Sequence, residues 1–340
     1  ENYDNLWIYW RSEVAVKYST RNKSFVFGNF GKNIGESRNS IFISNKPINF
    51  PSIDFKWEIN RKLDFHYQYS FLNKKSIEID DTPFYKYKSL VYHGLKYQLN
   101  SKIQISFHET VIFDRNLEFN YLNPFIFYYP ISRYIGYNDN NQIGIECSFS
   151  PNKRSKYFAS LLIDEWDPDL TFEKYHENWI AYQVGGYLNN IFLNDKFYFE
   201  YTWTDFRVYE NLYEDADFYL NGSSIGFWTG SHAQSFLIDY NFSFNKFLFN
   251  LSYLNVKRGF QPENLIDVAY EKINFDRFSK GYEQKEKLSI ELDYHYNSLL
   301  DFGVSINYLN WTIDSESDNQ INGRLFLGTE INYYFKELKL

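Results

Sequence analysis

Apolar and polar side chains alternate one by one along much of the chain. Leu288, Ile290 and Leu292 occupy one parity, and Ser289 and Glu291 occupy the other. A period of two is the pattern of a β-strand with one apolar and one polar face. The alternation recurs and predicts strands over fifteen segments: 5–19, 24–30, 52–59, 63–72, 87–98, 102–113, 141–149, 156–166, 178–191, 196–208, 233–244, 247–257, 286–297, 300–313 and 321–336.

The connections between these strands are sorted by length. Short turns on one side of a sheet and long loops on the other are typical of bacterial outer-membrane barrels, whose long loops face outward. A secreted β-sandwich or β-solenoid is the alternative, but neither has a reason to sort its loops so strictly. Tight turns are predicted near 60–62, 99–102, 150–155, 192–195, 244–247 and 297–300, and long polar segments near 73–86, 114–140, 167–177, 209–232 and 258–285.

We therefore predict an all-β fold, a transmembrane antiparallel outer-membrane β-barrel that residues 1–340 form as a single domain with long extracellular loops. About 16 strands are expected, with 14 and 18 open, because barrels with both termini in the periplasm have an even number. The sixteenth strand could be Ser40–Ser44 or could precede residue 1. The glycine- and proline-containing segment 28–50 could instead fold into the lumen. Inward charges of both signs favour a plugged lumen over an open pore.

The composition agrees with such a barrel. Aromatic residues make up 22% of the chain, yet its mean hydropathy is −0.52, and no stretch approaches the roughly 18–20 apolar residues of a spanning helix. Met is absent, as expected if a signal peptide or another N-terminal piece has been removed. The net charge of −8 argues against a nucleic-acid partner. Cys147, the single cysteine, excludes a disulfide framework and lies on an apolar, lipid-facing parity.

Several short motifs resemble the Wzi-type capsule-assembly outer-membrane barrel family, in the same order along the chain. They are the glycine-punctuated stretch 28–59, Glu109 followed by Tyr121-Leu122-Asn123-Pro124, the Asp139-Asn140-Asn141 step, Leu161–Trp166 and Gly226–His232. The chain is shorter than the enterobacterial members and shows no helical N-terminal region, so the periplasmic role of that region is not carried over. Glu109 also breaks the alternation of its strand, which indicates the outer rim or a bulge.

The resemblance implies a surface lectin, in which the outward loops of a plugged barrel hold capsular or other surface polysaccharide and assist capsule or exopolysaccharide assembly. Sugars stack on aromatic rings, and amides and carboxylates bind their hydroxyls. For each ring, a role as girdle anchor or loop packing competes with sugar binding. The candidate carbohydrate-binding residues are Tyr121, Tyr128, Tyr129, Asp139, Asn140, Trp166, Tyr175, Trp179, Tyr219 and Trp228.

Other functions remain open at this point. A diffusion porin or transporter component, or a structural barrel subunit of a larger outer-membrane complex, would need the same strands. Ser223, Ser224 and Ser231 lie near His232, but no pattern places a nucleophile, base and orienting group together, so we expect no enzyme, and no cofactor or metal site. The expected location is the bacterial outer membrane with loops exposed at the cell surface. The expected partners are outer-membrane lipid and lipopolysaccharide, surface polysaccharide and, as a further option, other outer-membrane proteins.

Overall fold

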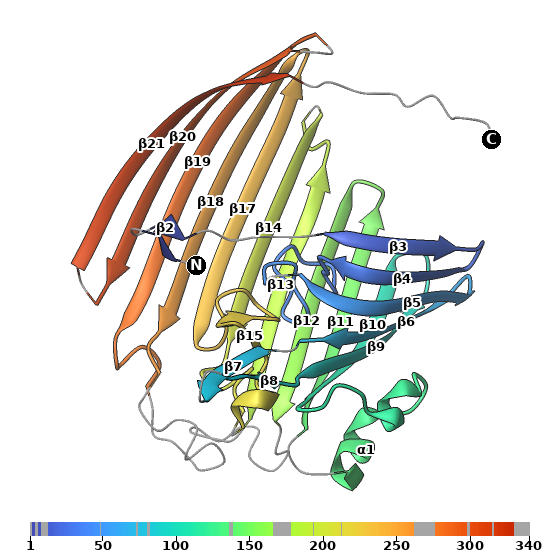
Figure 1. Ribbon diagram of the computed structural model, residues 1–340. Coiled ribbons are helices and arrows are strands. Elements are labelled where there is room, and N and C mark those ends of the chain that lie inside the picture. Colours follow the sequence, from blue (N-terminus) through green and yellow to red (C-terminus); the bar gives the residue numbers. More distant parts are fainter. Residues whose placement is uncertain are drawn as a thin grey trace, which may run out of the picture.

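A computed structural model describes residues 2–3, 6–7, 13–47, 49–72, 74–79, 82–135, 139–165, 178–192, 194–211, 213–261, 276–297, 300–314 and 316–329. Fifteen strands form one antiparallel, strongly curved sheet (Figure 1). Their order in the sheet follows the chain, from β3 at one edge to β21 at the other. The strands are β3 (Val14–Ser19), β4 (Lys23–Phe30), β5 (Phe50–Asn60), β6 (Leu63–Phe71), β9 (Ser89–Gln98), β10 (Ile103–Phe113), β11 (Asn140–Asn152), β12 (Ser155–Glu165), β13 (Trp179–Asn189), β14 (Asp195–Thr204), β17 (Ala233–Phe244), β18 (Phe247–Gly259), β19 (Tyr282–Asn297), β20 (Leu300–Ile313) and β21 (Glu316–Thr329).

Smaller elements complete the described part of the chain. The two-residue strands β1 and β2 pair with each other near the N-terminus, and β7 and β8 form a separate hairpin. None of the helices in the described ranges is long and apolar enough to span a membrane. The elements are β1 (Asn2–Tyr3), β2 (Leu6–Trp7), β7 (Lys74–Ile79), β8 (Thr82–Lys86), the 3-10 helices η1 (Phe119–Leu122) and η3 (Glu214–Ala216), helix α1 (Tyr128–Ile135), β15 (Tyr219–Leu220) and β16 (Ser223–Ser224).

Each of the fifteen predicted segments overlaps one strand of the sheet, which confirms the predicted fold class. Three details were wrong. Ser40–Ser44 is no wall strand, because only an isolated bridge joins Ile43 to Ile34. The predicted loop 73–86 contains the hairpin of β7 and β8. The last strand begins at Glu316, earlier than predicted. Within the described ranges β3 and β21 do not pair with each other, so the sheet is not closed there.

The alternation seen in the sequence becomes two faces of the sheet. Leu288, Ile290 and Leu292 lie on the outer face of β19, where each side chain is more than a third exposed. On the opposite face the hydroxyl of Ser289 donates to Asn307 Oδ1 of β20 at 2.7 Å. Apolar residues outside and paired polar groups inside are what a membrane-spanning sheet requires, because lipid offers no hydrogen bonds.

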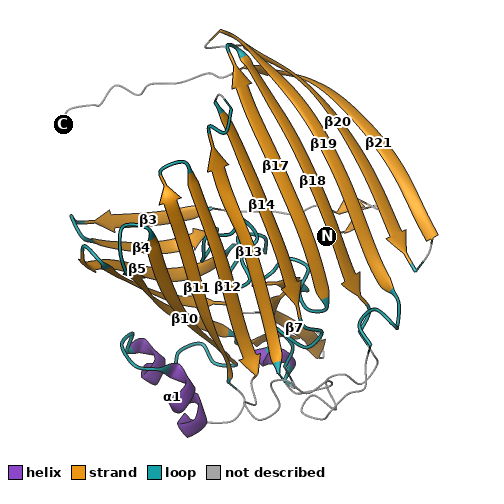
Figure 2. Ribbon diagram, turned by 180° about the vertical axis from the view of Figure 1, so that it is seen from behind, coloured by secondary structure: helices purple, strands orange, loops and turns teal. Residues whose placement is uncertain are grey.

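The two ends of the sheet differ, as predicted. Turns of a few residues join β3 to β4, β5 to β6, β9 to β10, β11 to β12, β13 to β14, β17 to β18 and β19 to β20 at one end, which we call the short-turn end. The strand ends that the longer connections join lie at the opposite end of the sheet, which we call the long-loop end (Figure 2). The turn between β20 and β21 is the one short connection at the long-loop end within the described ranges. Asn245, with φ 52°, starts the β17–β18 turn, a left-handed position that asparagine tolerates well.

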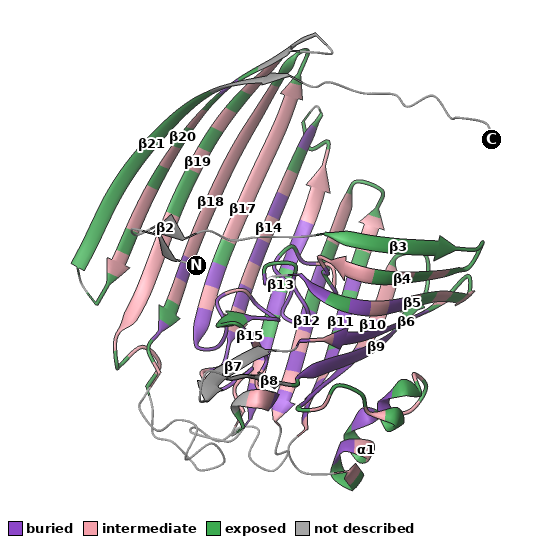
Figure 3. Ribbon diagram, in the orientation of Figure 1, coloured by how far each residue is buried: buried purple, intermediate pink, exposed green. Residues whose placement is uncertain are grey.

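Residues 31–49, the plug segment, fill the concave side of the sheet. Ile41, Phe42 and Ile43 are almost fully buried in one apolar cluster with inward-facing Leu162 and Ala181 of the wall. The Phe42 ring stacks on His108 of β10, with 4.2 Å between ring centroids. The buried residues accordingly concentrate in the half of the sheet that surrounds this segment (Figure 3). The structure thus confirms that part of residues 28–50 folds into the lumen.

Inward charges of the wall bind the plug segment. Glu36 lies 2.5 Å from Lys156 Nζ and 3.5 Å from Lys96 Nζ. Arg38 forms an ion pair with Asp239, and the Asn39 amide donates to Glu200 Oε1 at 3.0 Å. Wall carboxylates and amines that would be costly alone in a narrow lumen therefore find partners in the plug.

Gly144 of β11 provides the space into which the plug fits. A Cβ atom at this position would lie 2.3 Å from Phe42 Cε1, whereas a Cβ at Gly323 of β21 would meet nothing within 4 Å. We expect Gly144→Val to destabilise the protein by about 1–3 kcal/mol through overpacking, with Gly144→Ala intermediate. Thermal unfolding in detergent measures the effect. Gly323→Ala is the control, and equal melting of Gly144→Val and the wild type would contradict the prediction.

Candidate functional site

A cavity of about 580 Å³ opens at the long-loop end of the sheet. Its walls come from the segment 205–232, which we call the cap segment, from Leu72 and Lys88 in the connection between β6 and β9, from the end of β18 with the two residues after it, and from Glu283 of β19. Two aromatic rings, Tyr219 and Phe260, line it together with Asn221. The charged lining residues are Lys88, Arg258, Glu210, Asp215, Asp217 and Glu283. The cavity therefore combines flat apolar surfaces with hydrogen-bonding groups.

The hairpin of β15 and β16 places Tyr219 and Asn221 at this cavity. Asn221 and Gly222 form its turn with φ values of 50° and 75°, the left-handed pair for which Asn-Gly is the preferred sequence. Leu220 and Ile225 anchor the hairpin in the apolar cluster that also contains Phe42 of the plug segment. The cap segment is thus folded onto the plug, and the exposed turn is left beside the cavity.

A hydrogen-bond network stiffens the cavity wall. Glu210 Oε1 accepts from the Tyr219 hydroxyl at 2.8 Å, from the Ser231 hydroxyl at 2.8 Å and from Gln261 Nε2 at 3.1 Å. Burial raises the pKa of Tyr219 above its ordinary value, so its hydroxyl stays protonated and donates. On the other side Lys88 pairs with Asp217 and donates to the Tyr219 carbonyl oxygen at 2.9 Å. A wall held in this way is preorganised for a polar ligand.

Comparison with known proteins identifies the fold. No protein-family model and no curated protein sequence matches the chain. Among solved structures it is similar to Wzi from Escherichia coli, described as a carbohydrate-binding β-barrel of the outer membrane involved in group 1 capsule assembly, with a TM-score of 0.60 and 12% identity over 93% of this chain and 69% of that one. The chain has an outer-membrane β-barrel fold. OccK3 (OpdO) from Pseudomonas aeruginosa is a second similar barrel, with a TM-score of 0.51 and 13% identity over 92% of this chain and 77% of that one.

The candidate sugar-binding residues predicted from the sequence lie in separate places of the barrel. Tyr219 lines the cavity, and Trp228 packs partly buried against the same apolar cluster. Trp179 of β13 is 2% exposed, with the Arg207 guanidinium 5.1 Å from its ring centre. Trp166 and Tyr175 lie outside the described residues. The prediction that these residues bind sugar stays a prediction.

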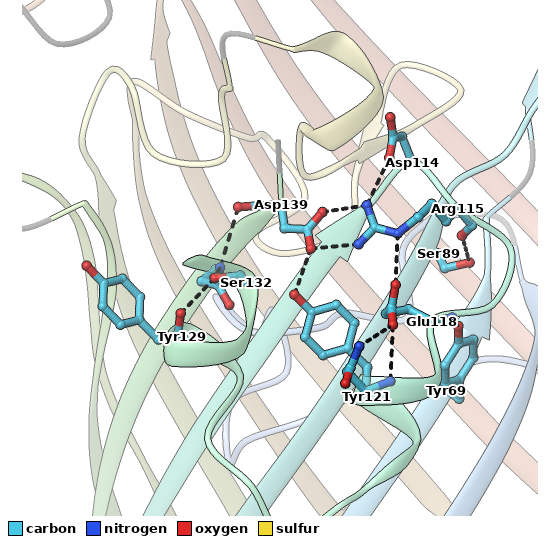
Figure 4. A network of polar contacts seen from close by, with 11 residues as sticks. Tyr69, Ser89, Asp114, Arg115, Glu118, Tyr121, Tyr129, Ser132 and Asp139 are labelled. Carbon is cyan, nitrogen blue, oxygen red and sulfur yellow. Dashed lines mark hydrogen bonds and ion pairs between the residues drawn. The ribbon is translucent and has the colours of Figure 1, made fainter. Parts of the chain in front are cut away.

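Three of the remaining candidates, Tyr121, Tyr129 and Asp139, belong to a network of polar contacts on the outer side of the barrel wall (Figure 4). Arg115 donates to both carboxylate oxygens of Asp139, at 3.0 and 2.7 Å, and the Tyr121 hydroxyl donates to Asp139 Oδ2 at 2.7 Å. The Tyr121 and Tyr128 rings are fully buried against the wall. Their faces are therefore closed to a sugar in this structure. Asn140 is also buried, and Tyr129 is half exposed.

Two alternatives from the sequence can be compared with the geometry. The Ser231 hydroxyl donates to Glu210, and His232 Nε2 accepts from the backbone N–H of Phe278 at 3.2 Å. The serine and histidine therefore do not form the hydrogen-bonded pair that a hydrolase needs. Within the described part of the chain no group of three or more His, Cys, Asp or Glu side chains is arranged to hold a metal ion.

Tyr219 is the one predicted candidate among the residues that line the cavity, and the sequence analysis missed the others. Lys88, Arg258, Phe260 and Gln261 line it but come from the ends of predicted strands or just beyond them. These residues come together only because the sheet curves and the cap segment folds inward. Local sequence patterns predict neither the curvature nor the position of the cap segment. The one available signal was their position at the long-loop end, where outer-membrane barrels carry their binding residues.

Proposed function

We propose that this protein binds a surface polysaccharide in the cavity at its long-loop end and so assists capsule or exopolysaccharide assembly. The observation that carries the proposal is the cavity itself, in which the Tyr219 and Phe260 rings stand beside the Asn221 amide and a fixed hydrogen-bond network. Rings that cover the apolar face of a sugar, with amides and carboxylates around them, form the usual carbohydrate site. The proposal places the barrel in the bacterial outer membrane with its long loops at the cell surface.

The filled interior favours a binding role over transport. The plug and cap segments share one apolar cluster on the concave side of the wall, and polar contacts tie the plug segment to β11, β12, β14 and β17. A diffusion porin or transporter component, the second candidate, is supported by the likeness to OccK3. A structural subunit of a larger outer-membrane complex is a third candidate, in which the cavity would receive a protein instead.

Two substitutions test the cavity without breaking its framework. Phe260→Ala removes a partly exposed ring, and Asn221→Gly removes an amide while keeping the left-handed turn. We expect Phe260→Ala to weaken glycan binding about fivefold, as loss of an aromatic contact worth about 1 kcal/mol predicts. Asn221→Gly should weaken it by a similar factor, for one hydrogen bond of about 0.5–1.5 kcal/mol. Glycan arrays find the ligand, and titration of the purified protein in detergent measures the change.

Phe192→Ala is the matched control, because Phe192 is an exposed ring in the β13–β14 turn at the short-turn end. It should leave binding unchanged. Glycan binding that survives both cavity substitutions would remove the cavity as the site. Absence of glycan binding by the wild type, together with steady ion currents in planar bilayers, would favour the porin instead.

A further inference from the structure

Residues 114–135, which we call the belt segment, fold back against the outer side of the barrel wall. Figures 1 and 2 show α1 outside the sheet, beside β10. Tyr121 and Tyr128 pack there with Tyr67, Val91 and Val111, all on the outward parity of their strands. The sequence had predicted residues 114–140 as an outward loop for ligand. The structure instead lays most of this loop along the wall.

The belt segment covers a polar pair that could not face lipid. Glu109 is on the regular outward parity of β10, opposite His93 of β9, and neither the rim position nor the bulge expected from the sequence is found. Glu109 Oε1 accepts from the backbone N–H groups of Tyr128 and Tyr129, both at 3.0 Å, at the first turn of α1. Its other oxygen lies 2.8 Å from His93 Nε2. The carboxylate therefore holds the helix on the wall.

Other outward polar atoms of the wall bond to the backbone of the belt segment. The Tyr67 hydroxyl donates to the carbonyl of Tyr121 at 3.1 Å, and the Tyr69 hydroxyl donates to that of Asn116 at 3.1 Å. His93 Nδ1 lies 3.1 Å from the carbonyl oxygen of Pro124. Irregular backbone survives at membrane depth only where protein satisfies its polar groups. The wall supplies those bonds here.

The depth of the belt segment follows from the length of the strands beneath it. A strand of about 9–11 residues is just sufficient to cross the hydrocarbon core, and β10 has 11 residues. Contacts with the belt segment run from Phe113 at the long-loop end, against Tyr121 at 5.0 Å, to Phe107, against Phe127 at 6.2 Å between ring centroids. More than half of β10 is covered, so the belt segment lies beside the wall at a depth that lipid occupies.

The outer face of the belt segment is rich in exposed rings. Phe119 is 75% exposed, Phe127 is 65% exposed and Tyr134 is 88% exposed. They continue the apolar outer wall, in which Leu95 and Ile145 are also exposed. We propose that the belt segment is embedded in the outer leaflet, where its rings contact lipid acyl chains near the headgroup boundary. The partner of this surface is lipid, not polysaccharide or protein.

Site-directed spin labelling in reconstituted vesicles tests this placement. Cys147, the exposed cysteine on the outward parity of β11, carries the reference label for lipid. Lys153→Cys in the β11–β12 turn, combined with Cys147→Ser, carries the reference label for water. Phe127→Cys with Cys147→Ser reports on the belt segment. We expect its nitroxide to match the Cys147 label: accessible to oxygen, and several-fold less accessible to a water-soluble nickel complex than the Lys153→Cys label.

Phe125→Cys with Cys147→Ser repeats the measurement at a second position of the belt segment, since Phe125 is also 65% exposed. Agreement between the two positions shows that the result does not come from one substitution alone. Nickel accessibility at positions 127 and 125 equal to that of the turn label would overturn the proposal, because the rings would then face water. Lipid-like accessibility at either position supports it. The result is independent of glycan binding, because none of the four labelled positions lines the cavity.

Discussion

A variant in which a short Asn-Gly turn replaces residues 31–49 is expected to carry steady currents in planar bilayers. Phe30 and Phe50 are register partners in β4 and β5, so a tight hairpin can join them without moving the wall. The deletion removes Ile41, Phe42 and Ile43 from the centre of the apolar cluster. The cap segment then loses the surface on which Ile225 packs, and the lumen opens.

The expected current depends on whether the plug segment blocks the lumen, and not on how stable the barrel is. In the intact protein the plug segment is held through Glu36, Arg38 and Asn39 to strands β12, β17 and β14 of the wall. We expect only brief or no openings from the wild type. Phe127→Ala, which leaves the plug untouched, serves as the control and should not conduct. Sizeable steady currents from the wild type would contradict a sealed lumen and support the porin.

The wall of this barrel could be predicted from the sequence because lipid and lumen impose opposite demands on neighbouring residues. Outside the membrane a strand has no lipid-facing side, so its residues need not alternate between apolar and polar. Glu316–Gln320 contains no apolar residue, so the start of β21 had no alternating signal. Backbone hydrogen bonds to β20 extend the strand there in spite of its polar sequence, for example where Asp318 faces Trp311.

The connecting segments were harder to predict because their positions depend on distant contacts. Phe42 lies in the lumen because Gly144, a hundred residues away in the chain, leaves room for its ring. Tyr121 and Tyr128 have the residue types of a sugar site, yet the wall buries both rings. The break in alternation at Glu109 was the one local signal that something covers the outer wall. This signal could be interpreted only once the structure showed that α1 packs against the outer wall at Glu109.

That carboxylate gives the second large expected effect. Glu109 is 1% exposed and joins the N-terminus of α1 to His93. Removing one partner costs about 3–5 kcal/mol for a buried ion pair, and leaving a buried hydrogen-bonding group unsatisfied costs about 1–3 kcal/mol. Glu109→Ala should therefore release the belt segment from the wall, while the strands of the barrel remain paired.

Tryptic cleavage after Arg133 in detergent-solubilised protein measures the release, because Arg133 is exposed on α1 but sits in folded helix. Cleavage tracks the population of the open form when opening is fast, so about 3 kcal/mol predicts a rate roughly a hundredfold higher for Glu109→Ala. Glu109→Gln, which keeps an oxygen acceptor for the helix N–H groups, should give an intermediate rate. On top of Glu109→Ala, His93→Ala should add only the loss of the His93 contacts with the Pro124 carbonyl and the Tyr128 ring, since the contact between His93 and Glu109 is already broken. A cleavage rate at Arg133 that does not change in Glu109→Ala would mean that ring packing alone, through Tyr121 and Tyr128, holds the belt segment in place.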